Sequence, residues 1–359
     1  MGTYVPNTKE EQKQMQGIIG IDSIEELYSD IPDEVKLNAP LNIPSGMSEM
    51  ELSKKITNIA GKNKVFDSVF RGCGAYRHYI PAIVKQVTSK EEFVTAYTPY
   101  QAEISQGILQ SIYEYQTMIC SLTGMQVANA SVYDGACAAA EAVIMSKEKK
   151  RKKALVSAST NPMIIETIAT YIRGTDMEME VIPTKNGITD IDVLKEKLND
   201  ETACLLIQQP NYYGLIEDGD EIGRILGDTD IKYIISCNPI SLGILKTPAE
   251  YGADIAVGEG QSLGMSLSFG GPYLGFMATT NKLMRKLPGR IVGETTDAQG
   301  NRAFVLTLQA REQHIRREKA SSNICSNQAL CAMTAAVYLA AMGKKGLQKV
   351  ATLSMSKAH

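Results

Sequence analysis

Short apolar segments alternate with helical segments through the middle of this 359-residue chain, and this alternation constrains the fold more than any other feature. The apolar segments include KALVSAS, ACLLIQQP and KYIISCNP, and segments between them, such as DIDVLKEKLND, have helical periodicity. Strands that are apolar on both faces and are joined by helices form a mainly parallel, doubly wound sheet. We therefore expect an α/β fold built on such a sheet.

Sheets of this kind bind ligands at the carboxyl ends of their strands. These ends are expected at residues 157–160, 208–213 and 236–239. Residues 133–136, YDGA, begin a further helix, and their glycine would let a phosphate approach free backbone N–H groups. An equally weighted alternative is an ordinary helix start capped by Asp134, whose negative charge would repel a phosphate.

Composition excludes several classes of partner. With 37 basic and 40 acidic residues, the net charge of −3 gives no electrostatic basis for binding nucleic acid or an anionic membrane. No apolar run approaches the roughly 18 residues that span a bilayer, and the N-terminus lacks a targeting pattern, so a cytoplasmic location is expected. Seven cysteines without a C-x-x-C pair and three histidines favour a reducing compartment and no metal site.

Three segments are expected along the chain. Residues 1–100 form a helical N-terminal segment, residues 101–325 form the large α/β domain, and residues 326–359 begin a C-terminal lobe. The final residues, VATLSMSKAH, have no C-cap glycine or polar tail after them. We therefore expect the C-terminal lobe to be incomplete and the chain to be a fragment.

Residues 254–276, DIAVGEGQSLGMSLSFGGPYLGF, have the pattern of a buried strand, a Gly/Ser-rich loop and a second strand, and they contain no lysine. In α/β enzymes that bind pyridoxal phosphate covalently, a lysine follows such a strand, because imine formation needs a positioned amine. Gln261 and Ser262 occupy that stretch here. A chain of this class would have the scaffold without the anchor, and its function would depend on another subunit. The loop 266–273 could bind an anion, but a tight turn is favoured.

Basic side chains gather in residues 309–325, QAREQHIRREKASSNIC, which include Arg311 and His314. Arginine forks bind carboxylates bidentately, so this segment could hold an amino-acid carboxylate or an acidic partner surface. By composition alone, a solvated charged helix is favoured over such a site.

Two upstream segments, residues 72–81 and 98–107, place aromatic and charged groups among glycines and prolines. Such groups on rigid turns suit a binding surface, although an anchored loop has the same composition. Their candidate residues are Arg77, His78, Thr98, Tyr100 and Gln101.

Six strings in the chain are long or specific enough to carry a family resemblance. They are GCGAYRHYIPA, TPYQAEISQGILQ, NASVYDGA, GADIAVGEGQSLGMSLSFGGPYLGF, PGRIVGETTDAQGNRAFVLTLQAREQHIRREKASSNIC and NQAL. They resemble the P-protein family, the decarboxylating glycine dehydrogenases of the glycine cleavage system. In some members this protein is split into two subunits, and the strings resemble the N-terminal half, subunit 1. The likeness covers essentially the whole chain. It implies the fold type I architecture of pyridoxal-phosphate-dependent transferases, in agreement with the alternating pattern.

The resemblance also implies an activity that depends on a second subunit. In this family, subunit 2 would hold pyridoxal phosphate on its lysine, and the two chains would form an α₂β₂ heterotetramer. Glycine would lose its carboxylate there as carbon dioxide and pass its aminomethyl group to the lipoyl arm of the H-protein. Ser262 falls where the partner has its lysine, and Ser236 or Cys237 falls where the carboxylate that pairs with the pyridinium nitrogen would be.

By the same resemblance, this chain would complete the partner's active site. The residues expected to reach the partner's cofactor phosphate are Ser268, Gly270 and Gly271. Those expected to line the mouth of the site are Thr98, Tyr100 and Gln101. Those expected to hold either the glycine carboxylate or the H-protein are Arg77, His78, Arg311 and His314. The chain departs from the family pattern at Cys73, Asn238 and Ser321, where alanine, aspartate and threonine are expected.

Two alternatives to a shared active site stay open. The first is a purely structural pseudoenzyme subunit that stabilises the catalytic partner and touches no substrate. The second is a free-standing pyridoxal enzyme that uses another lysine, Lys246 or Lys282. The residues around Lys246 have the pattern of a surface turn, which disfavours the second alternative.

Overall fold

The structure, a computed structural model, describes residues 7–37, 39–70, 74, 76–96 and 98–359. The chain divides into two compact units, Met1–Phe70 and Arg71–His359, which are described separately. The predicted segment boundaries at residues 100 and 325 stay predictions. Cys73, one of the predicted departures from the family pattern, lies outside the described residues.

Unit 1 is made of short helices that have no core of their own. They are α1 (Lys9–Ile19), α2 (Glu49–Ala60) and the 3₁₀ helices η1 (Ile24–Tyr28) and η2 (Asp33–Val35). Thr8 and Ser48 begin the two α-helices with capping boxes, in which Glu11 and Glu51 bond back to the cap. None of the residues in these four helices is buried. Capping therefore accounts for the local helices, since none of their described residues is buried in an apolar core.

A seven-stranded sheet forms the centre of unit 2, in the order β1-β9-β8-β7-β6-β2-β3. Its strands are β1 (Val127–Ala128), β2 (Lys153–Ser157), β3 (Glu178–Ile182), β6 (Thr202–Gln209), β7 (Lys232–Cys237), β8 (Ile255–Glu259) and β9 (Gly275–Thr279). The run from β8 to β3 is parallel, whereas β9 is antiparallel to both of its neighbours. The predicted mainly parallel sheet is confirmed, and the solved structures compared below confirm its fold class.

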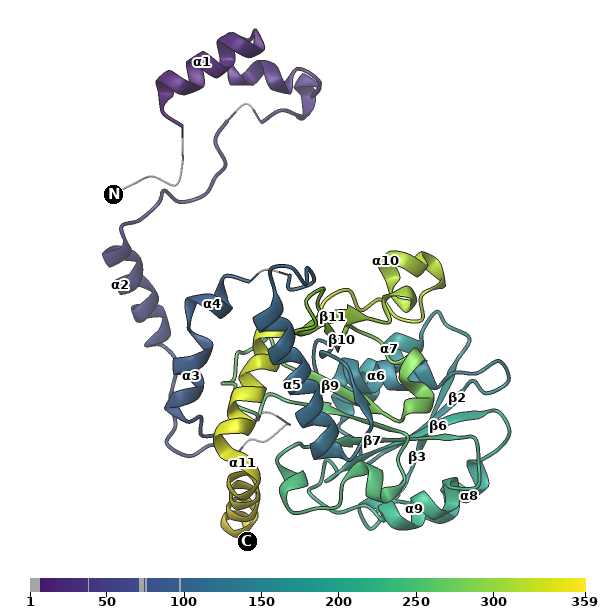
Figure 1. Ribbon diagram of the computed structural model, residues 1–359. Coiled ribbons are helices and arrows are strands. Elements are labelled where there is room, and N and C mark those ends of the chain that lie inside the picture. Colours follow the sequence, from purple (N-terminus) through teal and green to yellow (C-terminus); the bar gives the residue numbers. More distant parts are fainter. Residues whose placement is uncertain (1–6, 38, 71–73, 75, 97) are drawn as a thin grey trace. The chain divides into compact units, whose positions relative to one another are not determined.

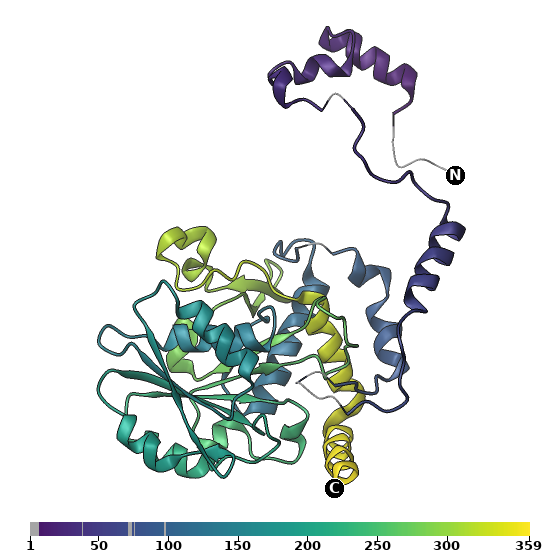
Figure 2. The same cartoon turned by 180° about the vertical axis from the view of Figure 1, so that it is seen from behind.

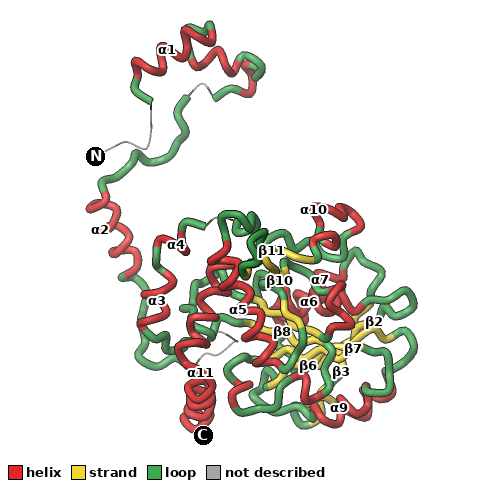
Figure 3. Tube along the Cα trace, viewed as in Figure 1, coloured by secondary structure: helices red, strands yellow, loops and turns green. Residues whose placement is uncertain are grey.

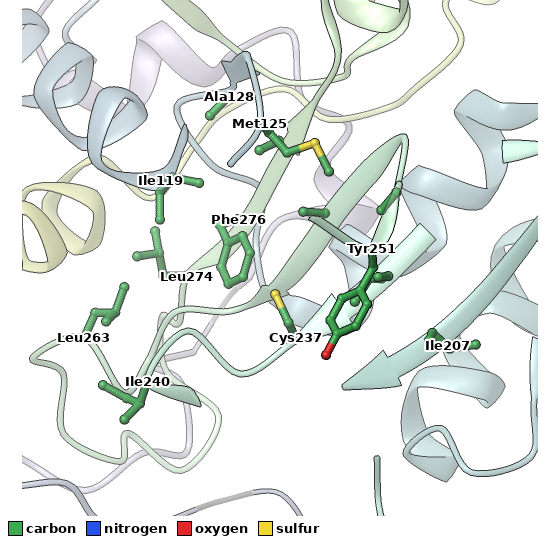
Figure 4. Packing of buried hydrophobic residues seen from close by; sticks show 14 of the residues in the cluster. Ile119, Met125, Ala128, Ile207, Cys237, Ile240, Tyr251, Leu263, Leu274 and Phe276 are labelled. Atoms are coloured by element: carbon green, nitrogen blue, oxygen red, sulfur yellow. The ribbon is translucent and has the colours of Figure 1, made fainter. Parts of the chain in front are cut away.

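Helices cover both faces of this sheet (Figures 1 and 3). One face packs against α6 (Gly135–Ser146) and α7 (Pro162–Ile172). The other packs against α5 (Gln106–Thr123), α8 (Ile191–Lys197), α9 (Gly219–Leu226) and α11 (Ala329–Ala358). In β2, Ala154 and Val156 enter the first core and Leu155 enters the second, as the period of two along a strand requires. Figure 4 shows the second core around Ile119 and Phe276.

A two-stranded hairpin of β10 (Ile291–Thr296) and β11 (Arg302–Thr307) packs against α5, which also lies beside α11 (Figure 2). Within α11, Gly343 has a φ of 60° and divides the helix into two parts. The other elements are α3 (Ala82–Thr88), α4 (Glu91–Val94), β4 (Thr184–Lys185), β5 (Ile188–Thr189), α10 (Gln313–Arg316), η3 (Ser241–Gly243), η4 (Pro248–Tyr251), η5 (Asn281–Lys286), η6 (Gln309–Arg311) and η7 (Arg317–Lys319). In the part of the chain that the structure describes, no helix has both the length and the apolar character to cross a membrane.

The carboxyl edge of the sheet is packed closely at two glycines. A Cβ atom on Gly258 of β8 would lie 2.2 Å from the carbonyl oxygen of Cys237 on β7. A Cβ atom on Gly135, the first residue of α6, would lie 2.7 Å from the backbone nitrogen of Glu259. Both neighbours are backbone atoms, so they cannot turn aside as the end of a side chain would. These glycines therefore bring α6, β7 and β8 into direct backbone contact.

Replacing Gly258 by alanine should destabilise unit 2, because the added methyl group would overlap a backbone oxygen. We expect a loss of about 3 kcal/mol in the free energy of unfolding, measured by urea denaturation followed by circular dichroism. Gly107 of α5 is a matched control, since no atom lies within 4 Å of its added Cβ. There the same substitution should stabilise the helix by about 0.5–1 kcal/mol. Equal changes in the free energy of unfolding at Gly258 and Gly107 would contradict a close contact between Gly258 and Cys237.

Candidate functional site

The carboxylate of Glu259, at the end of β8, binds three backbone N–H groups. Its Oε2 accepts a hydrogen bond from Gly135 N at 2.9 Å, at the start of α6. Its Oε1 accepts from Gln261 N at 2.9 Å and from Leu274 N at 3.0 Å. Asp134 caps the same helix by accepting from Cys137 N at 2.8 Å. Two of the free N–H groups at the first turn of α6, those of Gly135 and Cys137, thus donate to carboxylates of the chain itself.

A pyridoxal phosphate does not fit at this helix start. Its phosphate would need the N–H groups that Glu259 and Asp134 already use, and both side chains would repel it. No space separates the elements either, since a Cβ on Gly135 would lie 2.8 Å from the Cβ of Glu259. Burial raises the pKa of Glu259 against the opposing effect of its three N–H donors. Of the two interpretations of residues 133–136, the geometry favours the capped helix start.

The residues in the position of the missing lysine are buried and carry no amine. Ser262 is 5% exposed, and its hydroxyl has no hydrogen-bond partner among the described residues. Gln261 donates from its side-chain nitrogen to the carbonyl of Met265 at 2.5 Å. On β7, Ser236 is buried and burial raises the pKa of the Cys237 thiol to about 12. None of these four side chains supplies either an imine-forming amine or a carboxylate for a pyridinium nitrogen.

Lys246, the alternative nucleophile, lies in an exposed ion pair. Its ammonium group is 2.8 Å and 2.9 Å from the two carboxylate oxygens of Asp220. This hydrogen bonding raises the pKa of Lys246, whereas a nucleophilic lysine needs a lowered pKa. Lys282 is likewise on the surface. These environments disfavour a free-standing pyridoxal enzyme.

A second group of functional side chains surrounds Arg290, which follows the Pro-Gly turn before β10. Its guanidinium pairs with the buried Glu312 and donates to the carbonyl of Cys325 at 3.0 Å. The same guanidinium lies 4.3 Å from the ring centre of Tyr100, whose hydroxyl donates to Ser326 at 3.2 Å. The fold therefore places the predicted residue Tyr100 beside Arg290, which in turn contacts the basic segment 309–325 through Glu312 and Cys325. Stacking on a ring and pairing with a carboxylate are typical of a buried arginine.

Arg290 also lines a cavity of about 420 Å³, called the arginine cavity below. Its lining is Arg290, Gln313, His314, Arg317, Glu318, Ile324 and Cys325. The Glu312 carboxylate nearby already pairs with Arg290, and the lining itself contains the carboxylate of Glu318 beside the guanidinium of Arg317. A guanidinium in such a cavity can bind a carboxylate, which places Arg317 as its candidate cation. Sequence reasoning missed Arg290, although the string PGRIVGET contains it.

Arg311 does not line the arginine cavity. Its guanidinium donates to the backbone carbonyls of Leu287 and Gly289, and burial lowers its pKa. The geometry thus gives Arg311 a structural contact that holds the turn before β10, while its predicted binding role stays a prediction. His314 is half-exposed and lies within 3.6 Å of Glu312.

The remaining predicted residues lie in other places. In the loop after β8, Ser268 donates to the carbonyl of Pro272 at 3.3 Å and Gly271 donates to the carbonyl of Ser268 at 2.9 Å, which makes a tight turn. The tip of this turn, Phe269, is 92% exposed. The others are Gly270 at the same tip, Thr98 and Gln101 on either side of Tyr100, and Arg77 and His78 before α3. Of this last pair, Arg77 is exposed and burial lowers the pKa of His78.

Comparison with known proteins agrees with this geometry. The family model of the glycine cleavage system P-protein matches residues 2–359. The chain is 55% identical over 359 residues to the probable glycine dehydrogenase (decarboxylating) subunit 1 of Carboxydothermus hydrogenoformans, covering 99% of this chain and 81% of that protein. It is 52% identical over 358 residues to the protein of the same name from Moorella thermoacetica, covering 99% and 80%.

Solved structures give the same result. A crystal structure of glycine decarboxylase (P-protein) of the glycine cleavage system, in inhibitor-bound form, has a TM-score of 0.91 and 41% identity. The match covers 97% of this chain and 79% of that one. The sphingosine-1-phosphate lyase of Burkholderia pseudomallei, at a TM-score of 0.60 and 16% identity over 90% of this chain and 75% of that one, shares the fold alone.

Replacing Glu259 by glutamine should weaken the start of α6. The amide oxygen would still accept from Gln261 and Leu274, but the amide nitrogen would face the N–H of Gly135 and leave it without an acceptor. We expect a loss of about 1–3 kcal/mol in the free energy of unfolding, measured by urea denaturation. Glu103→Gln, on an exposed loop, should change this free energy by less than about 0.5 kcal/mol. An unchanged free energy of unfolding in the Glu259→Gln variant would show that the three N–H contacts do not stabilise the fold.

Proposed function

The chain belongs to the glycine cleavage system P-protein family, and from this premise we propose that it is the subunit of a glycine decarboxylase that lacks the covalent cofactor anchor. Proteins of this subunit 1 type are parts of an oxidoreductase, glycine dehydrogenase (decarboxylating). The observation that carries the proposal is the carboxyl edge of the sheet, where Glu259 fills the start of α6 and the residues at 261 and 262 carry no amine. An active complex then needs a second subunit.

In this proposal the partner subunit holds pyridoxal phosphate, which supplies the electron sink for decarboxylation when bound. The lipoyl arm of the H-protein receives the aminomethyl group, the two subunits form an α₂β₂ assembly, and the complex is cytoplasmic. Support comes from the relatives, which are numbered as subunit 1, and from the poor fit of a phosphorylated cofactor at the start of α6.

Two surfaces of this chain are proposed to complete the partner's site. The first is the loop of Ser268, Gly270 and Gly271, whose exposed tip is available to a neighbouring chain. The second is the region of Thr98, Tyr100 and Gln101, which the Tyr100 ring joins to the arginine cavity. That cavity would bind either the glycine carboxylate or an acidic surface of the H-protein through Arg317 and His314. Arg77 and His78 lie outside its lining, and their role in holding either molecule stays a prediction. A structural subunit without these roles is the alternative.

Mixing this chain with its partner should restore an activity that neither chain has alone. The measurement is glycine-dependent bicarbonate exchange with H-protein present, together with the absorbance of the cofactor in each separate chain. We expect no exchange and no cofactor absorbance for this chain alone, because Gln261 and Ser262 cannot form an imine. A cofactor that borohydride traps on this chain alone would contradict the proposal.

Tyr100→Phe and Ser268→Ala should separate a shared active site from a structural role. Each variant removes one hydroxyl, and each should lower kcat about 10-fold or more while the assembly size, measured by analytical ultracentrifugation, stays the same. Ser121→Ala removes an exposed hydroxyl from α5 and is the matched control. Full activity in both site variants would favour the structural alternative.

Arg317→Ala should show which anion the arginine cavity binds. Loss of a charge-assisted contact to a carboxylate should raise one KM by roughly 10-fold or more. A higher KM for glycine assigns the cavity to the substrate, whereas a higher, salt-dependent KM for H-protein assigns it to that partner. Arg224→Ala, an exposed arginine on α9, should change neither value. Unchanged values in Arg317→Ala would remove the cavity from the proposal.

A further inference from the structure

A second cavity lies between α6, α7 and residues 321–324, and the proposed function does not use it. Its volume is about 340 Å³, within the size range of small-molecule sites. It shares Ile324 with the arginine cavity, but its lining contains a carboxylate and no basic side chain. The polar side chains in its lining include Glu141, Tyr133, Tyr171, Thr175 and Ser322.

Glu141, in the middle of α6, is the only charged side chain in this lining and is 4% exposed. Burial raises its pKa to about 7, and the one group that favours its charged form is the Ser322 hydroxyl. No cation of the described residues contributes to that balance. A carboxylate buried in this way carries a large desolvation cost unless a positive or hydrogen-bonding group meets it.

Two other buried glutamates have hydrogen-bond donors among the described residues that Glu141 lacks. Glu312 pairs with Arg290, and Glu217 accepts from Ser159, Thr189 and Asn211 at 2.6–2.8 Å. Each therefore has at least one strong donor within the chain. The described residues offer Glu141 only the Ser322 hydroxyl, so further donors would come from a molecule in the cavity.

The rest of the lining favours an ammonium group over other donors. The hydroxyls of Tyr133, Thr175 and Ser322 each accept one backbone N–H already, and a hydroxyl oxygen has a second lone pair for another donor. An ammonium group has three N–H donors to share among these oxygens, the Tyr171 hydroxyl and the Glu141 carboxylate. Tyrosine rings also attract a cation. A multivalent metal ion is disfavoured, since the described residues contain no group of three His, Cys, Asp or Glu side chains that could hold one. Ile144 gives the cavity an apolar wall for a short carbon chain.

We propose that this cavity binds a small primary amine in its protonated form, with the ammonium group on Glu141 and the carbon chain against Ile144. The site is separate from the closed edge at Glu259 and needs neither pyridoxal phosphate nor a partner subunit. It can therefore be tested on the full chain alone.

The experiment measures the melting temperature of the full chain at pH 8 with increasing ethylammonium chloride, against sodium chloride at the same ionic strength. We expect a saturable rise of about 2 °C beyond the effect of salt. Tetramethylammonium chloride, a cation of similar charge without N–H donors, should give a smaller rise. No response to ethylammonium beyond that of salt, or an equal response to tetramethylammonium, would overturn the proposal.

Two variants assign the response to the cavity. Glu141→Gln removes the charge and Ile144→Phe fills the apolar side, so each should abolish the extra rise. Glu166→Gln, an exposed glutamate on α7, should respond as the wild type does. A wild-type response in Glu141→Gln would overturn the proposal. If Glu141→Gln does not fold, the test uses Ile144→Phe alone. A wild-type rise in melting temperature in that variant would also overturn the proposal.

Discussion

The hydrogen bonds between the Glu259 carboxylate and three backbone N–H groups hold the functional edge of this fold in a closed form. They join the end of β8 to the first turn of α6 and to the residue before β9. Gly135 and Gly258 allow the backbones to meet at this point without side chains between them. Because the helix start is where an anion would otherwise bind, Glu259 together with the capping Asp134 disfavours an anion at this edge.

With that edge closed, the groups that remain available to other molecules lie around it. The arginine cavity presents guanidinium groups, the adjoining cavity presents the carboxylate of Glu141, and Ile324 belongs to both linings. Tyr100 ties a loop from before α5 to the first of these cavities through its ring and its hydroxyl. The fold thus places the closed edge at Glu259 apart from the two cavities and from the Tyr100 contact.

The sequence predicted the sheet because its evidence is local: a period of two in the strands and of about 3.6 in the helices can be read within each segment. The missing lysine was equally visible. The hydrogen bond between Glu259 and Gly135 could not be predicted, since the two residues are 124 positions apart and no periodicity links them. Arg290 was missed for a similar reason, because its burial depends on Glu312 and Tyr100, which come from distant segments. Arg311 was noticed for its charge, but its contacts are to backbone carbonyls.

The closed helix start has a consequence for any attempt to redesign this edge. A lysine introduced at position 261 or 262 would supply an amine, yet the Glu259 carboxylate would still occupy the N–H groups that a phosphate needs. Replacing Glu259 alone would open those groups but leave no nucleophile. A covalent cofactor site at this edge would therefore need at least two changes made together, and a library of single substitutions would not contain one.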